Sequence, residues 1–310
     1  MSDILTIVIG TYCQSPKKLL STINSILLQN CENIKIIIVD DNYSKDYSDN
    51  ISNNIKYLNE DKIKIVRNDT NIGVPHVFRK WFSLVTTKYF MFYCEGDILI
   101  DNSINKMIDF LNNNSKIFAV HGQEYDENGL ITKSLFPNTG LYSTKIYLDS
   151  KFKNGHFGWS NASAMYRTEI VKWHDLEVIN NWYWDFTFQL KLLIFSESIG
   201  YINEPLAKRD GDGRDYLTEL RNNYFKINTE RILLAYKFLC DNELFLLMKK
   251  VDINTYKYAI AKRLIYSCFR EKNILNRQHV INIVINIYFK IFVSKIFDTP
   301  FLFLHFFKNK

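Results

Sequence analysis

Residues 34–46 read IKIIIVDDNYSKD, and the first half of this stretch decides the fold class. Ile34–Val39 is a short run in which every residue except Lys35 is apolar and β-branched, which is typical of a buried strand. The run ends abruptly at Asp40-Asp41-Asn42, where short polar side chains favour a turn. We therefore predict a buried strand over residues 34–39 with a polar turn directly after it.

The same pattern recurs along the first 125 residues. Further apolar runs predict strands at 4–9, 63–67, 89–93 and 117–121. Apolar residues at helical spacing predict helices between these strands, at about 16–27, 74–85 and 102–112. Strands that alternate with helices imply βαβ units, so we predict an α/β fold with a mostly parallel sheet flanked by helices.

Polar residues follow four of these strands at the point where each strand ends. They are Thr11-Tyr12, Asp40-Asp41, Arg67-Asn68 and Glu95-Gly96-Asp97. Ligands of parallel sheets bind beyond the carboxyl ends of the strands. The sequence therefore predicts a ligand site at this edge of the sheet.

The triplet Glu95-Gly96-Asp97 places two carboxylates one residue apart after a buried strand. Carboxylates suit a hard divalent cation that bridges substrate phosphates, and Gly96 lets the backbone approach a ligand. A solvated turn is the alternative interpretation. The pair Asp40-Asp41 can accept hydrogen bonds from a base or from ribose hydroxyls, or can simply be a polar strand end.

Several common site types are excluded. Gly10–Ser15 lacks the glycine-rich phosphate turn of dinucleotide-binding proteins, and the chain has no P-loop, GxSxG or HExxH motif. The five cysteines never form a CxxC pair, which argues against a zinc site and for a reducing compartment.

The net charge of +6 is spread over scattered Lys and Arg residues, so we expect no nucleic-acid partner. Mild basicity fits anionic phosphates or an acidic membrane surface. We see no signal peptide and no apolar run of the roughly 18 residues that a membrane span needs. We therefore expect a cytoplasmic protein, with peripheral contact on the inner face of the cell membrane as an open alternative.

Four motifs together carry a family resemblance. They are Val8-Ile9-Gly10-Thr11-Tyr12, residues 39–46, Asn71-Ile72-Gly73 and Glu95-Gly96-Asp97. In order and spacing they resemble family 2 inverting glycosyltransferases with the A-type glycosyltransferase fold, of the bacterial surface-polysaccharide type. Departures are Gly10 for a proline, Cys13 for an asparagine and Glu95 for the first aspartate.

The resemblance implies a donor site for a nucleoside-diphosphate sugar, with a UDP-sugar preferred. Thr11 and Tyr12 would line the base, Asp40 would bind the uracil, and Glu95 would meet the ribose or donor sugar. Asp97 would hold Mg²⁺ or Mn²⁺ on the diphosphate. The remaining donor-site candidates are Asp41, for which a structural role is favoured, and Arg67, Asn71, Gly73 and Arg209.

The second half of the chain is expected to bind the acceptor. Gly200–Leu206 resembles the family's E-P-L segment, and Asp185 matches the acidic residue that deprotonates the acceptor hydroxyl. Asp185 could instead only cap a helix that follows it. Trp182 and Trp184 could stack on the acceptor or belong to the core, and Trp159 is expected near the acceptor.

The segment after E-P-L also has an implied role. Arg209 would neutralise the leaving diphosphate, and Gly211 and Gly213 suggest a loop that closes over the donor. The family's histidine is missing here, which leaves the third metal ligand open.

We predict a catalytic domain over 1–215 and a helical region over 216–310. Within the first, residues 1–100 would bind the nucleotide sugar and 101–215 the acceptor. Residues 280–310 interleave aromatic and apolar residues with lysines, which is typical of a helix that lies on an anionic membrane. Docking of this region on the catalytic domain is the alternative.

The predicted function is sugar transfer to a hydroxyl of a glycan or lipid-linked glycan in surface polysaccharide synthesis. A non-catalytic sugar-nucleotide-binding protein is one alternative, favoured by Trp184 and by the missing histidine. A nucleotidyltransferase is another, although Gly10–Ser15 lacks the glycine-rich basic loop that this class needs.

Overall fold

The structure is a computed structural model of the 310-residue chain. It describes residues 4–12, 15–56, 58, 60–153, 159–169, 185, 188–189, 192–193 and 196–210. The chain divides into two units, residues 1–144 with 158–214 and residues 145–157 with 215–310. The sheet and the site described below belong to the first unit. The predicted boundary at residue 215 stays a prediction, because residues beyond 210 lie outside the described part.

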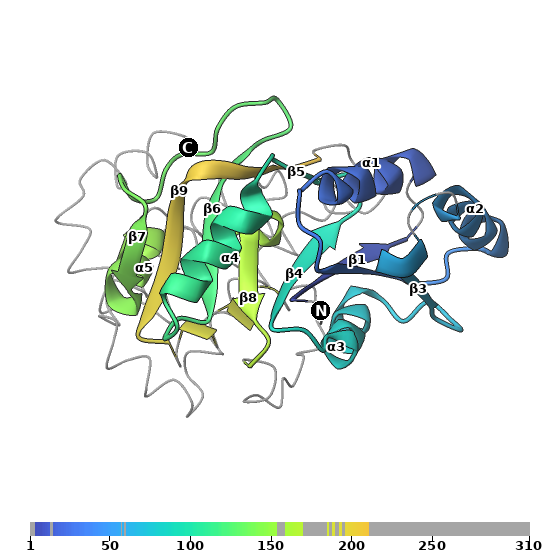
Figure 1. The fold of residues 1–310 in the computed structure, drawn as a ribbon, viewed down its shortest axis with the longest axis horizontal. Coiled ribbons are helices and arrows are strands. Elements are labelled where there is room, and N and C mark those ends of the chain that lie inside the picture. The colour runs from blue at the N-terminus through green and yellow to red at the C-terminus, as the bar shows by residue number, and fades with distance from the viewer. Residues whose placement is uncertain are drawn as a thin grey trace, which may run out of the picture. The chain divides into compact units, whose positions relative to one another are not determined.

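Within the described residues, nine strands form one mixed sheet in the order β3-β2-β1-β4-β8-β6-β9-β5, with β7 paired to β9 (Figure 1). One half is fully parallel and consists of β1 (Leu5–Thr11), β2 (Ile34–Asp40), β3 (Ile63–Arg67) and β4 (Tyr89–Cys94). The other half contains β5 (Ile98–Leu99), β6 (Ala119–Tyr125), β7 (Gly140–Ser143), β8 (Ala164–Arg167) and β9 (Ser198–Lys208). This arrangement confirms the predicted α/β fold.

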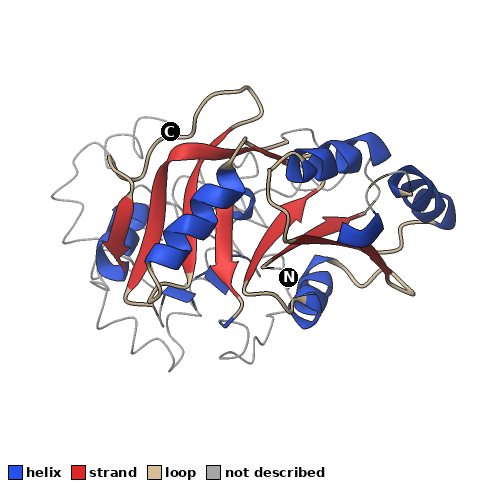
Figure 2. Ribbon diagram, in the orientation of Figure 1, coloured by secondary structure: helices blue, strands red, loops and turns tan. Residues whose placement is uncertain are grey.

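The described helices accompany the strands along the chain (Figure 2). They are α1 (Pro16–Leu27), α2 (Lys45–Ile55), α3 (Val74–Leu84), α4 (Ser103–Asn113) and α5 (Thr144–Lys153), with single 3₁₀ turns at Glu60–Lys62 and Asn161–Ser163. The three helices predicted in the first half of the chain are confirmed. None of the helices in the described part has both the length and the apolar character needed to cross a bilayer.

Helix α2 was not expected, because its sequence is dominated by Asn, Ser and Asp, which are poor helix formers. It forms because the Ser44 side chain caps its first turn, accepting a hydrogen bond from the Tyr47 amide. Ile51 and Ile55 then bury its inner face. Tertiary packing therefore overrides a weak local propensity at α2.

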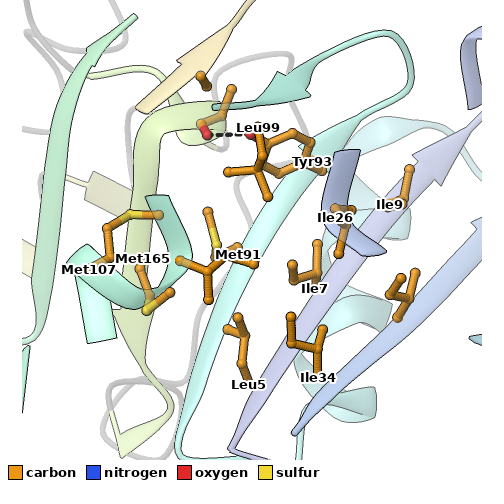
Figure 3. Close-up of a cluster of buried hydrophobic side chains, with 14 of the residues drawn as sticks. Leu5, Ile7, Ile9, Ile26, Ile34, Met91, Tyr93, Leu99, Met107 and Met165 are labelled. Atoms are coloured by element: carbon orange, nitrogen blue, oxygen red, sulfur yellow. Dashed lines mark hydrogen bonds between the residues drawn. The ribbon is translucent and has the colours of Figure 1, made fainter. Parts of the chain in front are cut away.

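Alternate side chains of the central strands point to opposite faces of the sheet and pack in two separate core layers. On one face Ile7 and Ile9 of β1 and Met91 and Tyr93 of β4 pack with Ile26 of α1 (Figure 3). The other face is aromatic: Phe90 and Phe92 of β4 contact the rings of α3, which are Phe78, Trp81 and Phe82. Apolar side chains on both faces explain why the strands are continuously apolar.

Candidate active site

The carboxyl ends of β1, β2, β3 and β4 lie together at one edge of the sheet. Thr11 is in register with Asp40, and Asp40 with Arg67, while Gly10 is in register with Cys94. The polar residues that follow these strands are therefore neighbours, as the sequence predicts.

Gly10, at the end of β1, is required by its surroundings. A Cβ atom at this position would lie 2.5 Å from Cζ2 of Trp81 on α3. The tryptophan ring therefore takes the space of a side chain at residue 10, which explains the glycine where the family commonly has a proline.

Glu95 ties the end of β4 to the end of β1. Its carboxylate is 3% exposed and accepts hydrogen bonds from the Thr11 hydroxyl at 2.5 Å, the Tyr47 hydroxyl at 3.2 Å and the Tyr12 amide at 3.2 Å. The hydroxyls of Thr11 and Tyr47 also contact each other. Glu95 therefore orders the residues around it, and its predicted contact with the ribose or donor sugar stays a prediction.

Asp40 lies at the end of β2 with only 1% exposure. Its Oδ1 accepts a hydrogen bond from the Asn42 amide at 3.0 Å, and its Oδ2 accepts one from the Ser48 hydroxyl. The Arg67 Nε lies 3.8 Å from Oδ2, and the same guanidinium donates to Asn42 Oδ1 at 2.9 Å. The predicted donor residues Asp40 and Arg67 are thus brought together, with Arg67 on the solvent side.

Asp41 holds the turn that begins α3. Its carboxylate accepts hydrogen bonds from Asn68 Nδ2 at 2.7 Å and from the amides of Ile72 and Gly73, each at 3.0 Å. Gly73 has φ 77°, a backbone conformation that favours glycine, and its amide also donates to Asn71 Oδ1. In this structure the predicted residues Asp41, Asn71 and Gly73 therefore all shape one loop at the edge of the site.

Replacing Asp41 by Ala is expected to lower the free energy of unfolding by about 1.5–3 kcal/mol, because buried N–H donors would lose a charged acceptor. Urea unfolding of the purified protein measures this change. Asp69→Ala is the matched control: Asp69 lies nearby but is exposed, so a change below about 0.5 kcal/mol is expected. Equal effects of the two substitutions would contradict the role of Asp41 in the loop.

Three tyrosines form a partly exposed aromatic cluster beside Asp40. Tyr12 and Tyr43 meet edge to face with ring centroids 5.2 Å apart, and Tyr43 and Tyr47 do so at 5.9 Å. Tyr12 is 42% exposed and Tyr43 is 55% exposed. The cluster offers flat aromatic surface on which a nucleobase could stack. Only Tyr12 was predicted as a site residue: Tyr43 lies inside the motif at residues 39–46 but was given no role, and Tyr47 belongs to α2, which was not expected.

The turn at Gly96-Asp97 contacts residues far away in the sequence. Gly96 has φ 99°, and a Cβ atom there would lie 2.3 Å from Oδ2 of Asp210. Asp97 is half-buried, and its Oδ1 accepts a hydrogen bond from the Asp210 amide at 3.0 Å. Thr22 of α1 fixes the turn, accepting from the Gly96 amide and donating to the Asp97 carbonyl.

An open pocket of about 550 Å³ adjoins this turn. Its lining residues are Lys18, Ser21, Gly96, Ile98, Glu127, Lys208, Arg209 and Asp210. The predicted residue Arg209 therefore lies beside Asp97's turn, and its Nε is 2.8 Å from Oε1 of the buried Glu124. Lys18, Glu124 and Asp210 were not found from the sequence, because each is joined to the site only through tertiary contacts.

The chemistry of these residues fits a divalent cation held mainly by substrate. Carboxylate oxygens are hard ligands, and Mg²⁺ is commonly bound by one or two carboxylates together with substrate phosphates and water. Asp97 supplies such a carboxylate in the turn that adjoins the pocket. Among the residues that the structure describes, no three His, Cys, Asp or Glu side chains are arranged to enclose an ion by themselves.

On the acceptor side, Asp185 is helical and half-buried. Burial raises the pKa of the Tyr166 hydroxyl well above its ordinary value, and the negative charge of Asp185 raises it further. The other predicted acceptor residues of this segment, Trp182 and Trp184, lie outside the described residues, as does the chain beyond residue 210.

Trp159 is buried in the core. Its ring stacks on His121 with centroids 5.3 Å apart, and its Nε1 donates to the Tyr166 hydroxyl at 2.9 Å. The structure thus shows a packing role for Trp159, and its predicted contact with the acceptor stays a prediction.

Comparison with known proteins agrees with this geometry. Residues 6–172, more than half of the chain, match the family model described as glycosyl transferase family 2. An uncharacterized glycosyltransferase of Methanocaldococcus jannaschii is 25% identical over 289 residues, which cover 84% of this chain and 97% of that protein.

Solved structures show the same fold at low identity. Residues 1–349 of S. aureus TarS in complex with UDP-GlcNAc match with a TM-score of 0.62 and 13% identity, covering 96% of this chain and 92% of that chain. In another TarS structure this chain spans only 43% of the matched chain. A mannosyltransferase from Pyrobaculum calidifontis in complex with GDP-Man and Mn²⁺ matches with a TM-score of 0.56 and 11% identity, covering 93% and 81%.

The predicted A-type glycosyltransferase fold is thereby confirmed. The parallel half of the sheet carries acidic residues at its carboxyl edge, and residues 6–172 match the family model. The chain belongs to glycosyl transferase family 2 and is a glycosyltransferase.

Proposed function

We propose that this glycosyltransferase transfers a sugar, with inversion, from a UDP-sugar to a hydroxyl of a glycan or lipid-linked glycan used in surface polysaccharide synthesis. The observation that carries the proposal is the meeting of Thr11, Asp40 and Glu95 at one edge of the sheet, with Asp97 in the turn directly after Glu95. The similar TarS structure holds UDP-GlcNAc, which supports a uridine nucleotide as the donor.

The donor would lie across the carboxyl edge. Its base would stack on the exposed ring of Tyr12 and face Asp40 and Arg67, while Thr11 and Glu95 would border the ribose or sugar. The diphosphate would lie toward Asp97 and Arg209. Mg²⁺ or Mn²⁺ bound there by Asp97 would supply positive charge that stabilises the departing diphosphate. The Mn²⁺ in the similar mannosyltransferase structure supports a metal-dependent reaction.

The proposed chemical step is a single displacement. Asp185 accepts the proton of the acceptor hydroxyl as its oxygen forms a bond to the anomeric carbon of the donor sugar. The bond from that carbon to the phosphate oxygen breaks, and UDP leaves with its negative charge. Arg209 is placed beside the pocket to stabilise that charge. The anomeric configuration inverts because attack and departure occur on opposite faces.

Release of UDP tests the proposed function. The purified protein is incubated with UDP-GlcNAc, other UDP-sugars and GDP-Man, with Mn²⁺ and with EDTA, and the free nucleotide is measured. We expect slow Mn²⁺-dependent release of UDP from at least one UDP-sugar, by hydrolysis or transfer. Release from GDP-Man only would refute the uridine preference, and no release from any donor would refute the donor site.

The acceptor proposal includes peripheral association with the inner face of the cell membrane. Lysines are interspersed among Phe and Ile residues within residues 280–310, and a helix of this composition can bind anionic lipid. Deleting these residues is therefore expected to remove most of the protein fraction that sediments with anionic vesicles. Release of UDP should persist. A deletion variant that is unfolded, or one that still sediments fully, would contradict the membrane proposal.

A further inference from the structure

The segment that follows β9 is held against the Gly96-Asp97 turn. Ile98 of β5 pairs with Lys208 of β9, and the Arg209 amide donates to the carbonyl of Tyr125 at 3.0 Å. The next residue, Asp210, therefore lies directly over Gly96, where a Cβ atom would collide with it. Glycine at position 96 thus makes room for Asp210.

Asp210 makes two different contacts at this place. Its amide donates to Oδ1 of Asp97 at 3.0 Å, and its Oδ2 lies 2.6 Å from Nζ of Lys18. Lys18 belongs to the first turn of α1, 192 residues earlier in the chain. The ion pair therefore joins the first turn of α1 to the segment after β9, and Asp210 in turn connects Lys18 to the Asp97 carboxylate.

The charges explain why Lys18 is needed. The Asp210 amide bonds to the Asp97 carboxylate, so the Asp210 side chain adds a second negative charge near this turn, and like charges repel each other. The Lys18 ammonium compensates one of them. The side chains of Lys18 and Asp210 are only 24% and 19% exposed, so their attraction is screened less than that of a pair on the open surface.

We propose that Lys18 and Asp210 are positioning residues for the reaction: their ion pair keeps the Asp210 amide on Oδ1 of Asp97 and so orients this carboxylate toward the cation and diphosphate of the donor. The inference rests on the proposed function, because it requires Asp97 to meet the metal. It adds two residues that lie outside the sequence motifs of the donor site.

The test compares Lys18→Met, Lys18→Arg and Asp210→Asn with the unaltered protein. Calorimetry gives the Mn²⁺ concentration that half-saturates UDP binding, and a separate titration gives the affinity for uridine, which lacks the diphosphate. Lys18→Met and Asp210→Asn are expected to raise the Mn²⁺ requirement about two- to fivefold. Lys18→Arg keeps the ion pair and should restore the original value, and uridine affinity should not change.

Lys106→Met is the matched control, since it also removes a lysine from an ion pair, the one that Lys106 of α4 makes with Glu204 of β9. Its Mn²⁺ requirement should equal that of the unaltered protein. An unchanged Mn²⁺ requirement in Lys18→Met would overturn the inference and leave the donor site standing. So would weaker UDP binding in Lys18→Met, but not in Asp210→Asn, because Lys18 would then bind phosphate directly.

A purely structural role would show itself differently. Lys18→Met would then lower the melting temperature and the uridine affinity together, which also overturns the inference. If UDP binding to the unaltered protein does not depend on Mn²⁺, the metal role of Asp97 in the proposed function fails first. That result is visible before any variant is measured, so the two failures are distinguishable.

Discussion

Asp185→Asn is expected to lower the turnover number by about 10²–10⁴-fold, the contribution that a general base typically makes. Asn keeps the size of the side chain and remains a good helix cap, but it cannot accept the acceptor's proton at neutral pH. Donor affinity should persist, because the donor residues come from the carboxyl ends of β1 to β4. Steady-state transfer and UDP binding, measured on the same preparation, separate the two effects.

Two acidic residues that precede Asp185 in the sequence serve as controls for it. Asp175→Asn and Glu177→Gln should leave turnover within a few-fold of the unaltered protein. Full activity in Asp185→Asn would show that this residue only caps a helix. If activity were instead lost in either control, the catalytic base would be that residue, and the match of Asp185 to the family's acidic residue would be wrong.

Asp97→Ala is expected to abolish the Mn²⁺-dependent part of UDP binding. The substitution removes a carboxylate in the turn after β4, between the pocket-lining residues Gly96 and Ile98, whereas the apolar residues of the strand are untouched. The free energy of unfolding should fall by only about 0.5–1.5 kcal/mol, the value of a hydrogen bond such as the one that the Asp210 amide donates to Asp97. Calorimetry with and without Mn²⁺, together with urea unfolding, measures both quantities.

Asp101→Ala is the control for Asp97, because Asp101 is an exposed acid four residues later in the chain. It should change neither UDP binding nor stability. UDP affinity in Asp97→Ala that equals the unaltered value in the presence of Mn²⁺ would remove Asp97 from the metal site.

The strands and their polar ends were predictable because the signals are local. The composition of Ile34–Val39 alone predicts a buried strand. The parallel arrangement then brings Asp40 beside Thr11 and Arg67. The order of the four motifs added the family and its fold. Neither inference needs knowledge of a distant contact.

The remainder depends on tertiary structure. Helix α2 has poor local propensity and is stabilised by its Ser44 cap and buried isoleucines, so composition alone misses it. Lys18 and Asp210 meet only after α1 and β9 are in place. The packing of Trp159 against His121 and Tyr166 is likewise a tertiary contact that its place in the chain did not reveal, and its expected contact with the acceptor stays a prediction.

Glu95 and Asp41 illustrate a second limit. A motif marks both acids as part of the site, yet it does not say which atoms their carboxylates meet. In the structure Glu95 accepts from Thr11 and Tyr12, and Asp41 accepts from the amides of the α3 turn. Part of an acidic motif therefore serves to order the loops that surround a ligand.

Calorimetric titration of the intact protein with UDP-GlcNAc and related UDP-sugars tests whether the chain binds a uridine-diphosphate sugar at all. We expect saturable one-to-one binding of at least one UDP-sugar, which weakens when Mn²⁺ is removed with EDTA and is lost to competition with UDP. Absence of binding by every nucleoside-diphosphate sugar tried, with and without Mn²⁺, would contradict a donor site at the carboxyl edge of β1 to β4.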